Sequence, residues 1–223
     1  MEEFDVVIIG SGVAGMTAAI YTSRLGLKTQ VIENLIPGGQ IINVEKIEDF
    51  PGFPQGISGA ELTDLMKTQA QINGSEFVMS EISKISKKED VWTIQSSESK
   101  VMTKTIIIAA GSTLSKLNVP GEKELVGGGV SYCATCDGAF FIDQKVCVIG
   151  GGDSALQEAL SLSEFAKEIY ILCNKSSLHA QKILQDRVES DKKISIKFNV
   201  QISEIHGDGM VEHISILNLS NNE

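Results

Sequence analysis

The sequence has few of the residues on which several protein classes depend. It contains four cysteines in 223 residues, too few and too unevenly spaced for the disulfide framework of a small secreted protein. No apolar run approaches the length of a membrane-spanning helix, and Met1-Glu2-Glu3 leads into a strand-like run without a basic or apolar leader. We therefore expect a cytoplasmic protein with no membrane partner.

Basic residues are also scarce and scattered. The chain has 19 Lys and Arg against 29 Asp and Glu, which gives a formal net charge of -10. A chain of this charge without a lysine- or arginine-rich cluster is not expected to bind nucleic-acid phosphates or anionic lipid. Its 42% hydrophobic content is that of ordinary folded proteins, so we expect protein or small-molecule partners.

The first half of the chain begins with a βαβ unit. The apolar run at 4–9 predicts a strand buried on both faces, the stretch 14–25 predicts a helix, and 29–32 predicts the next strand. Between strand and helix stands the turn Gly10-Ser11-Gly12-Val13-Ala14-Gly15. In such a turn the glycines allow a tight bend, close approach of a pyrophosphate, and close packing of helix on strand. With Glu33 after the second strand to accept hydrogen bonds from a ribose, the motif predicts a dinucleotide site.

The second half repeats this pattern around the turn Gly150-Gly151-Gly152-Asp153-Ser154-Ala155. Here no carboxylate follows the second strand, where Cys173, Asn174 and Lys175 stand instead. A ribose 2′-hydroxyl therefore lacks its usual partner, and a 2′-phosphate would meet only Lys175 and His179 as cations. The turn predicts a second dinucleotide, with NADPH favoured over NADH. For both turns the alternative is a glycine motif kept only for packing.

These units predict an α/β fold with two dinucleotide-binding, Rossmann-like domains, each a parallel sheet with helices plus an antiparallel β meander. The stretch 112–121, with Pro120-Gly121, is the best linker, which gives domains at 1–113 and 114–223. The other expected elements are strands at 83–86, 91–94, 105–111, 145–149, 168–172 and 194–198, helices at 153–165 and 178–188, and an antiparallel pair around the turn at 207–209.

Two cysteines, Cys133 and Cys136, lie two residues apart just upstream of the second glycine turn. This spacing within a turn brings both sulfurs within bonding distance, so we predict a reversible disulfide. Half of a zinc site is one alternative and inert thiols are another, but no second Cys-x-x-Cys exists and Cys147 is expected to face the core, so we predict no metal. Asp137 either transfers protons to a thiolate or caps a helix, and Phe140-Phe141 is expected to be core.

Together these motifs resemble those of bacterial-type thioredoxin reductases, which are FAD-dependent pyridine nucleotide-disulfide oxidoreductases. The resemblance covers nearly the whole chain. It implies that FAD is bound by 1–113 and NADPH, or NADH, by 114–223. It also implies that electrons pass from nicotinamide through flavin to the Cys133–Cys136 disulfide, and that the dithiol then reduces thioredoxin or a thioredoxin-like protein. A homodimer is expected. The most specific matching segments are 10–15, Gly38-Gly39-Gln40, Phe50-Pro51-Gly52, Ala109-Ala110-Gly111, 133–138 and 150–155.

The resemblance also assigns individual residues. The redox residues are Cys133, Cys136 and Asp137. The residues expected to bind FAD are Gly10, Ser11, Gly12, Ala14, Gly15, Glu33, Asn34, Gly38, Gly39, Gln40, Asn43, Asp49, Ala109, Ala110 and Gly111. The residues expected to bind NAD(P)H are Gly150, Gly152, Asp153, Ser154, Ala155, Lys175 and His179.

The sequence departs from the family pattern at three places. Asp49 stands where the family has asparagine, which adds an anion beside the flavin cofactor. The loop 173–179 lacks the family's arginines, so most of the clamp for a 2′-phosphate is gone. Family members also continue with a last strand of the NAD(P)H domain and a segment that closes the FAD domain, so we expect this chain to be a fragment or a natural truncation. Whether the native reading frame continues beyond Glu223 would decide between them.

Two other functions fit the same motifs. One is a related flavoprotein disulfide reductase that takes electrons from NADH or ferredoxin, or that serves a peroxiredoxin-linked partner. The other is a non-catalytic module that senses nucleotides or redox state. Turnover with each donor and acceptor separates the first from a thioredoxin reductase, and copurifying flavin counts against the second.

Overall fold

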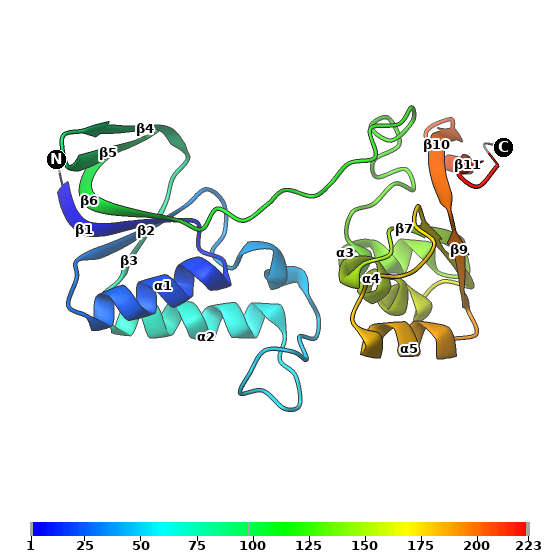
Figure 1. Ribbon diagram of the computed structural model, residues 1–223, viewed down its shortest axis with the longest axis horizontal. Coiled ribbons are helices and arrows are strands. Elements are labelled where there is room, and N and C mark those ends of the chain that lie inside the picture. Colours follow the sequence, from blue (N-terminus) through cyan, green and yellow to red (C-terminus); the bar gives the residue numbers. More distant parts are fainter. Residues whose placement is uncertain (1, 98, 222–223) are drawn as a thin grey trace. The chain divides into compact units, whose positions relative to one another are not determined.

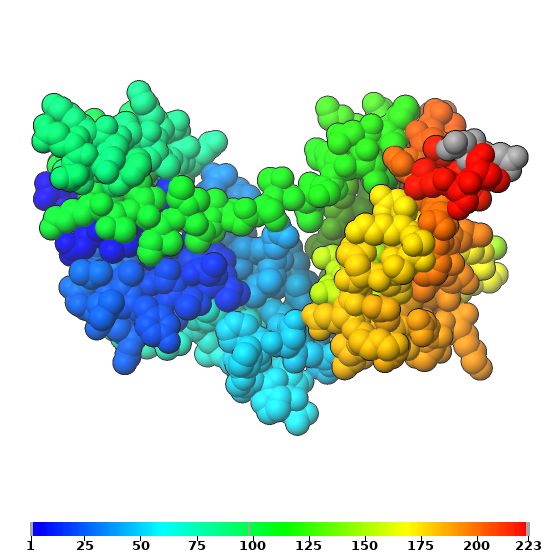
Figure 2. Space-filling view, viewed as in Figure 1, coloured from blue at the N-terminus to red at the C-terminus, as the bar shows by residue number. Residues whose placement is uncertain are grey.

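The structure, a computed structural model, describes residues 2–97 and 99–221 and divides into two compact units (Figure 1). The units are Met1–Thr113 and Leu114–Glu223. Every residue of the segment 111–118, which joins the two units, is exposed to solvent (Figure 2). Among the residues that the structure describes, no helix combines the length and apolar character needed to cross a bilayer.

The first unit is built on one six-stranded sheet in the order β3-β2-β1-β6-β5-β4. Its first four strands in that order run parallel, and a hairpin of two antiparallel strands extends the sheet beyond β6. The predicted combination of a parallel sheet and an antiparallel meander is therefore confirmed for this unit. The strands are β1 (Glu2–Ile9), β2 (Thr29–Glu33), β3 (Glu76–Met79), β4 (Ile82–Lys88), β5 (Val91–Ser96) and β6 (Lys100–Ile108).

Both faces of β1 are buried, as its apolar run predicts. Val6 and Ile8 pack with Ala19 of α1 (Val13–Arg24), while Val7 belongs to a second cluster with Ile94. Polar contacts add to this packing.

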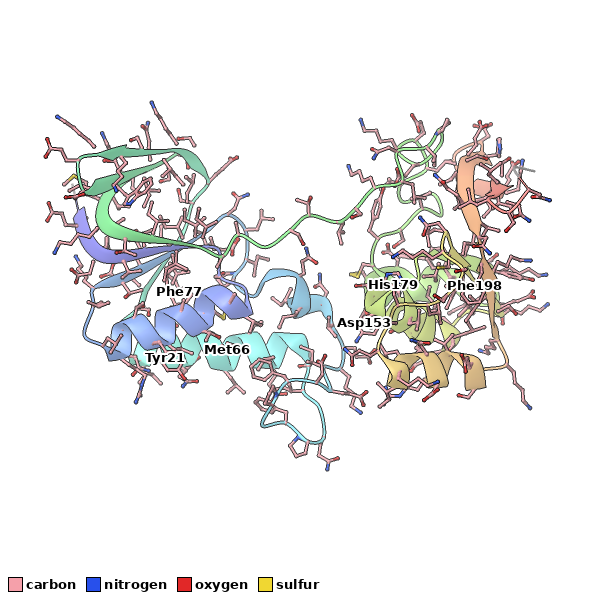
Figure 3. The ribbon with its side chains drawn as sticks, viewed as in Figure 1. Tyr21, Met66, Phe77, Asp153, His179 and Phe198 are labelled. Atoms are coloured by element: carbon pink, nitrogen blue, oxygen red, sulfur yellow. A yellow bond between two sulfur atoms is a disulfide. The ribbon has the colours of Figure 1, made fainter. Side chains whose placement is uncertain are left out.

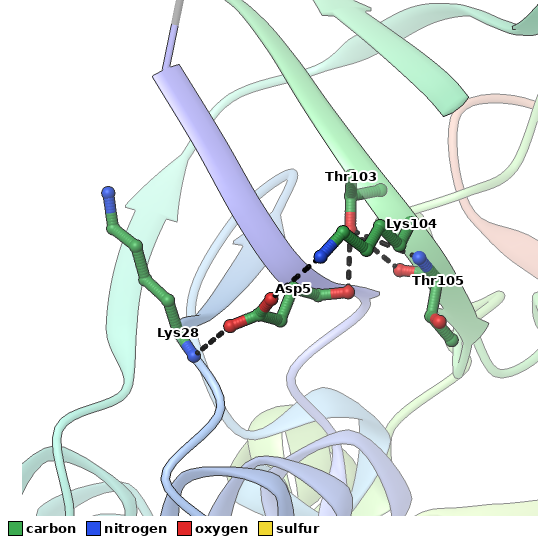
Figure 4. A network of polar contacts seen from close by, with 5 residues as sticks. All are labelled: Asp5, Lys28, Thr103, Lys104 and Thr105. Atoms are coloured by element: carbon green, nitrogen blue, oxygen red, sulfur yellow. Dashed lines mark hydrogen bonds and ion pairs between the residues drawn. The ribbon is translucent and has the colours of Figure 1, made fainter. Parts of the chain in front are cut away.

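Asp5 connects β1 to its neighbours on both sides (Figure 4). Its carboxylate accepts the backbone N–H of Lys28 just before β2 at 2.9 Å and lies 3.8 Å from Nζ of Lys104 on β6. The hydroxyl of Thr103 donates to the Asp5 carbonyl at 3.1 Å. These contacts reinforce the register of the three strands whose carboxyl ends form the first candidate site.

The helix α2 (Gly59–Ile72) was not expected from the sequence, although its start carries a signal. Ser58 is its N-cap and its hydroxyl accepts the backbone N–H of Glu61, and Ser-x-x-Glu is a capping-box pattern. Leu62, Met66 and Ala70 then recur every four residues and are buried. Burial contributes about 1.5–3 kcal/mol for a side chain such as Leu62. Figure 1 shows α1 and α2 side by side beneath the sheet.

The strand expected at 105–111 differs from the prediction at both ends. As β6 it begins at Lys100 and ends at Ile108, and Ile108 is 74% exposed rather than buried. Ile108 is exposed because β5 covers only the start of β6, where it is paired with residues 100–103. Beyond that point, among the described residues, β6 is paired with β1 alone.

The second unit has a three-stranded parallel sheet in the order β7-β8-β9 and a separate antiparallel pair, β10-β11. Leu156 of α4 and Leu184 of α5 pack with Ile169 and Ile171 of the sheet to form the core. This unit therefore repeats the predicted fold class. Its elements are α3 (Ala134–Asp137), η2 (Gly138–Phe141), β7 (Lys145–Ile149), α4 (Asp153–Ser163), β8 (Glu168–Cys173), α5 (Lys182–Ser190), β9 (Ile194–Phe198), β10 (Val200–Gly207) and β11 (Val211–Asn218).

Three expectations for this unit are wrong. Cys147 is exposed, because Val146 and Val148 of the same strand face the core and side chains alternate along a strand. Phe140 is 82% exposed, and only Phe141 of that pair packs against the core. The helix expected at 178–188 begins at Lys182, since hydrogen bonds hold residues 179 and 181 against the glycine turn.

Candidate functional site

The first glycine turn lies where β1 ends and α1 begins, and two of its glycines are required by packing. Gly10 has a φ of 96°, and a Cβ built on it would lie 2.3 Å from the carbonyl oxygen of Ala109. A Cβ on Gly15 would lie 1.9 Å from the carbonyl oxygen of Gly10. At this glycine turn the ends of β1 and β6 and the start of α1 lie so close together that positions 10 and 15 have no room for a side chain.

Gly12 differs, because nothing in the fold excludes a side chain there. Its φ is -69°, and the nearest atom to a Cβ built on it is Cα of Gly39, at 4.0 Å. The backbone N–H of Gly38 donates to the Ser11 carbonyl at 3.0 Å, which holds the Gly38–Gly39 segment against the turn. The result is a bare backbone surface at the start of a helix, which suits the diphosphate of a dinucleotide.

Glu33 at the end of β2 is tied to this turn. Its carboxylate accepts the backbone N–H of Ser11 at 2.8 Å and the Ser11 hydroxyl at 2.7 Å, and it also accepts the N–H groups of Asn34 and Leu35. Burial alone would raise the pKa of Glu33, but these hydrogen bonds outweigh it and hold the pKa below its ordinary value. The carboxylate is thus kept ionised beside the turn.

This lowered pKa predicts how the first unit responds to acid. A carboxyl group whose pKa is depressed by folding stabilises the fold above its unfolded pKa, about 4.3, and loses that contribution as the pH falls through the folded value. We expect thermal unfolding scans of Glu33→Gln to show a smaller loss of stability below about pH 4.3 than the unchanged protein. Glu76→Gln, which removes an exposed carboxylate from β3, is the control and should keep the full acid loss. Equal pH profiles for all three proteins would contradict the assignment.

The remaining residues expected to hold the first dinucleotide follow the ends of neighbouring strands. Gln40, in the short helix η1 (Gly39–Asn43), donates through Nε2 to the Ser112 carbonyl just beyond Ala109–Gly111. Because β2 and β6 flank β1, these segments meet at the carboxyl end of the central strand, where open α/β sheets bind ligands. Asn43 and Asp49 are exposed, and their contact with a cofactor remains a prediction. Ser112 carried no signal in the sequence.

The second glycine turn lines a pocket of about 350 Å³ at the start of α4. All seven residues expected to hold NAD(P)H lie on its wall, among them Asp153 and His179, which Figure 3 labels close together in the second unit. Three further residues complete the wall. The lining is Ile149, Gly150, Gly151, Gly152, Asp153, Ser154, Ala155, Asn174, Lys175 and His179.

Packing around this turn explains its composition. A Cβ on Gly151 would lie 2.6 Å from Sγ of Cys173, which is fully buried as the sequence predicts. The backbone N–H of His179 donates to the Gly151 carbonyl at 2.9 Å, and the Asp153 carboxylate accepts the N–H of Gln181 at 2.6 Å. These bonds fold the loop after β8 over the turn, which places Lys175 and His179 at the pocket.

The cysteine pair forms a disulfide, Cys133–Cys136, with its Cα atoms 5.3 Å apart. Cys133 is the N-cap of α3, and its Sγ accepts the backbone N–H of Cys136 at 3.1 Å. Asp137 does not cap a helix with its side chain; its carboxylate accepts the hydroxyl of Ser131 at 2.6 Å, and the same hydroxyl accepts the N–H of Cys133. Ser131, which belongs to no recognised motif, therefore connects the carboxylate to the backbone of the redox turn.

The other two cysteines are free thiols, with Cys147 exposed and Cys173 buried. Within residues 2–97 and 99–221, no three His, Cys, Asp or Glu side chains lie close enough together to hold a metal ion. Of the four cysteines, therefore, only Cys133 and Cys136 are joined in a disulfide among the described residues.

Two glycine-turn sites and a disulfide next to the second define a dinucleotide-dependent disulfide oxidoreductase. In agreement, residues 4–223 match the family Pyridine nucleotide-disulphide oxidoreductase. The chain is 43% identical over 215 residues to the thioredoxin reductase of Bacillus subtilis, covering 96% of this chain and 68% of that one. It is 44% identical over 206 residues to that of Listeria monocytogenes, covering 92% and 64%.

A solved structure gives the same result. The thioredoxin reductase of Lactococcus lactis is 42% identical and superposes with a TM-score of 0.95, covering 99% of this chain and 73% of that one. The chain belongs to the pyridine nucleotide-disulphide oxidoreductase family and, within it, to the bacterial-type thioredoxin reductases. Membership implies FAD and a pyridine nucleotide as cofactors. The chain spans 64% to 69% of the length of the curated relatives it matches.

Proposed function

We propose that the protein is a thioredoxin-disulfide reductase that transfers electrons from NADPH through FAD to the Cys133–Cys136 disulfide and on to thioredoxin. The observation that carries this proposal is the position of the disulfide. Its turn packs on α4, the same helix whose first residues line the second dinucleotide pocket. The relatives named thioredoxin reductase support the same activity.

The two units divide the cofactors in this proposal. Residues 1–113 bind FAD, with the diphosphate on the backbone around Gly12, the ribose at Glu33 and the flavin ring near Gln40. Residues 114–223 bind NAD(P)H in the pocket at the second turn. When bound, the nicotinamide supplies a hydride and the flavin delivers the electron pair to the disulfide.

The chain's own residues then carry out thiol–disulfide exchange. Reduction breaks the Cys133–Cys136 bond and leaves two thiols. One thiolate attacks a sulfur of the partner's disulfide to form a mixed disulfide, and the other thiol displaces the partner, so that two electrons and two protons reach the partner and the protein disulfide forms again. In this proposal Asp137, whose carboxylate accepts the Ser131 hydroxyl, supplies the proton to the departing thiolate.

The nicotinamide donor is expected to be selected only weakly. Asn174, Lys175 and His179 line the pocket, and lysine is a point charge without the paired donors of arginine. A hydrogen bond to a charged group contributes about 1.5–3 kcal/mol, so Asn174→Arg and His179→Arg should each raise the NADPH/NADH ratio of kcat/KM by about tenfold or more. The ratio is measured on the product of the complete native reading frame.

A neighbouring position provides the control for this comparison. Ser176→Arg adds the same charge to the same loop outside the pocket lining, and it should change the ratio far less. If the unchanged enzyme prefers NADPH strongly and neither pocket arginine alters the ratio, the phosphate is recognised elsewhere. Turnover with NADH, with ferredoxin and with a peroxiredoxin-linked acceptor in parallel tests the proposed donor and partner. We propose a homodimer, which sedimentation tests.

A further inference from the structure

Glu158 connects the second dinucleotide pocket to the redox turn. It lies on α4, five positions after Asp153, which lines the pocket. Its carboxylate Oε2 accepts the backbone N–H of Ala134, the first residue of α3 and the residue directly after Cys133. Neither the glycine motif nor the cysteine motif contains Glu158, so only the fold reveals this contact.

The environment of Glu158 is unusual for a carboxylate, since no salt bridge reaches it from residues 2–97 or 99–221. The side chain is partly buried, and burial raises its pKa, an effect that the hydrogen bond from Ala134 offsets only in part. Keeping a carboxylate here therefore costs free energy. A partly buried carboxylate with a raised pKa, beside a candidate site, is a candidate for a role in that site.

The contact acts on the part of the chain that determines where the sulfurs lie. Ala134 follows Cys133, so fixing its N–H fixes the backbone that carries the Cys133 sulfur. The N–H of Cys133 itself donates to the Ser131 hydroxyl, and the Cys133 carbonyl accepts the N–H of Asp137. Of these bonds, the one to Glu158 joins the turn to α4.

We propose that Glu158 is a positioning residue for the redox pair, holding the α3 turn against α4 in the geometry in which Cys133 and Cys136 are joined. An interaction that holds two sulfur atoms at bonding distance favours the disulfide over the two separate thiols. In the dithiol state the sulfurs can move apart, so the hydrogen bond from Ala134 to Glu158 stabilises this state less than it stabilises the disulfide. Glu158 thus stabilises the disulfide relative to the dithiol.

The test is the equilibrium between the protein and dithiothreitol. The reductant gives two electrons and two protons, its thiols close to a cyclic disulfide, and the Cys133–Cys136 bond opens to two thiols. The fraction reduced is read by acid quenching, alkylation and peptide mass mapping. This proposal deepens the function proposed above, since it concerns the same redox pair, but the assay uses neither nicotinamide nor flavin, so each can fail separately.

Glu158→Ala should shift this equilibrium about tenfold toward the dithiol, because a hydrogen bond to a charged group is lost from the oxidised turn. Tenfold corresponds to a rise in potential of about 30 mV for a two-electron couple. Glu158→Gln keeps an oxygen that can accept the Ala134 N–H and, being nearly the same shape, preserves the fold. We expect it to shift the equilibrium less than about threefold, since a lone partly exposed charge is screened by water.

The control is Glu164→Ala, which removes an exposed carboxylate at the end of the same helix and should leave the equilibrium unchanged. A large shift for Glu158→Ala with a small one for Glu158→Gln supports the proposal. If Glu158→Ala behaves as the control does, Glu158 does not position the pair. If Glu158→Gln shifts the equilibrium as far as Glu158→Ala, the hydrogen bond is not the cause, and the proposal is equally overturned.

Discussion

Gly15→Ala is expected to unfold the first unit, whereas Gly12→Ala should leave it folded and weaken its binding of FAD. The Cβ of an alanine at position 15 would lie 1.9 Å from the Gly10 carbonyl oxygen, and that atom belongs to the backbone of the tight turn. Relieving the overlap requires α1 and β1 to separate. We expect a loss of about 3–5 kcal/mol, a large part of the stability of a domain of this size.

At position 12 the same substitution meets open space. The φ of -69° is normal for alanine, and the added methyl group lies 4.0 Å from the nearest atom, so the free energy of unfolding should change by less than about 1 kcal/mol. The methyl group would, however, stand on the surface proposed to hold the diphosphate. Because that approach requires a bare backbone, we expect FAD affinity to fall by about a hundredfold, or 2.7 kcal/mol.

Two measurements separate the roles of these glycines. Thermal unfolding followed by circular dichroism gives the stability of each variant, and titration with FAD gives its affinity. Normal FAD binding by a stable Gly12→Ala protein would show that the flavin cofactor is held elsewhere. A Gly15→Ala protein as stable as the unchanged one would contradict the packing of α1 on the turn.

The second large effect is expected at the redox pair. Cys133→Ser and Cys136→Ser should each lower NADPH-dependent reduction of thioredoxin by about a thousandfold or more, since neither variant can form the disulfide that accepts the electron pair. Turnover is measured on the product of the complete native reading frame. Cys147→Ser is the matched control, because Cys147 is an exposed free thiol in the same unit.

The control should retain near-normal activity. Loss of activity in Cys147→Ser together with normal activity in Cys136→Ser would move the redox function to a different sulfur. Cys173 is a poorer control, because it is fully buried beneath Gly151 and its replacement would disturb the second turn directly.

Features that depend on short stretches of sequence could be predicted. The turn at 10–15 follows from local rules, since glycine positions, the preceding apolar strand and the following helix all lie within one βαβ unit. The Cys133–Cys136 disulfide could be predicted from the two-residue spacing of its cysteines. The helix α2 could have been found from Ser58 and Glu61, although it lies far from any chemical motif.

Features that depend on tertiary packing could not be predicted. The sequence of β7 is apolar throughout except for Lys145, so it does not show which side of the strand faces α4, and Cys147 was assigned to the wrong side. The hydrogen bonds of Asp137 with Ser131 and of Ala134 with Glu158 exist only once the chain has folded and brought these residues together. No periodicity or motif records such contacts.

The central claim is that electrons from NADPH reach the Cys133–Cys136 disulfide through FAD. The most direct test of it identifies which cysteines become reduced. The oxidised protein is mixed with FAD and NADPH without oxygen and without thioredoxin, quenched in acid, and its free thiols are alkylated and located by peptide mass mapping. We predict that alkylation appears at Cys133 and Cys136 only when FAD and NADPH are both present, while Cys147 and Cys173 are alkylated under all conditions once the protein is denatured. A Cys133–Cys136 disulfide that stays intact with both cofactors, yet opens with dithiothreitol, would contradict the proposed path from nicotinamide to the disulfide.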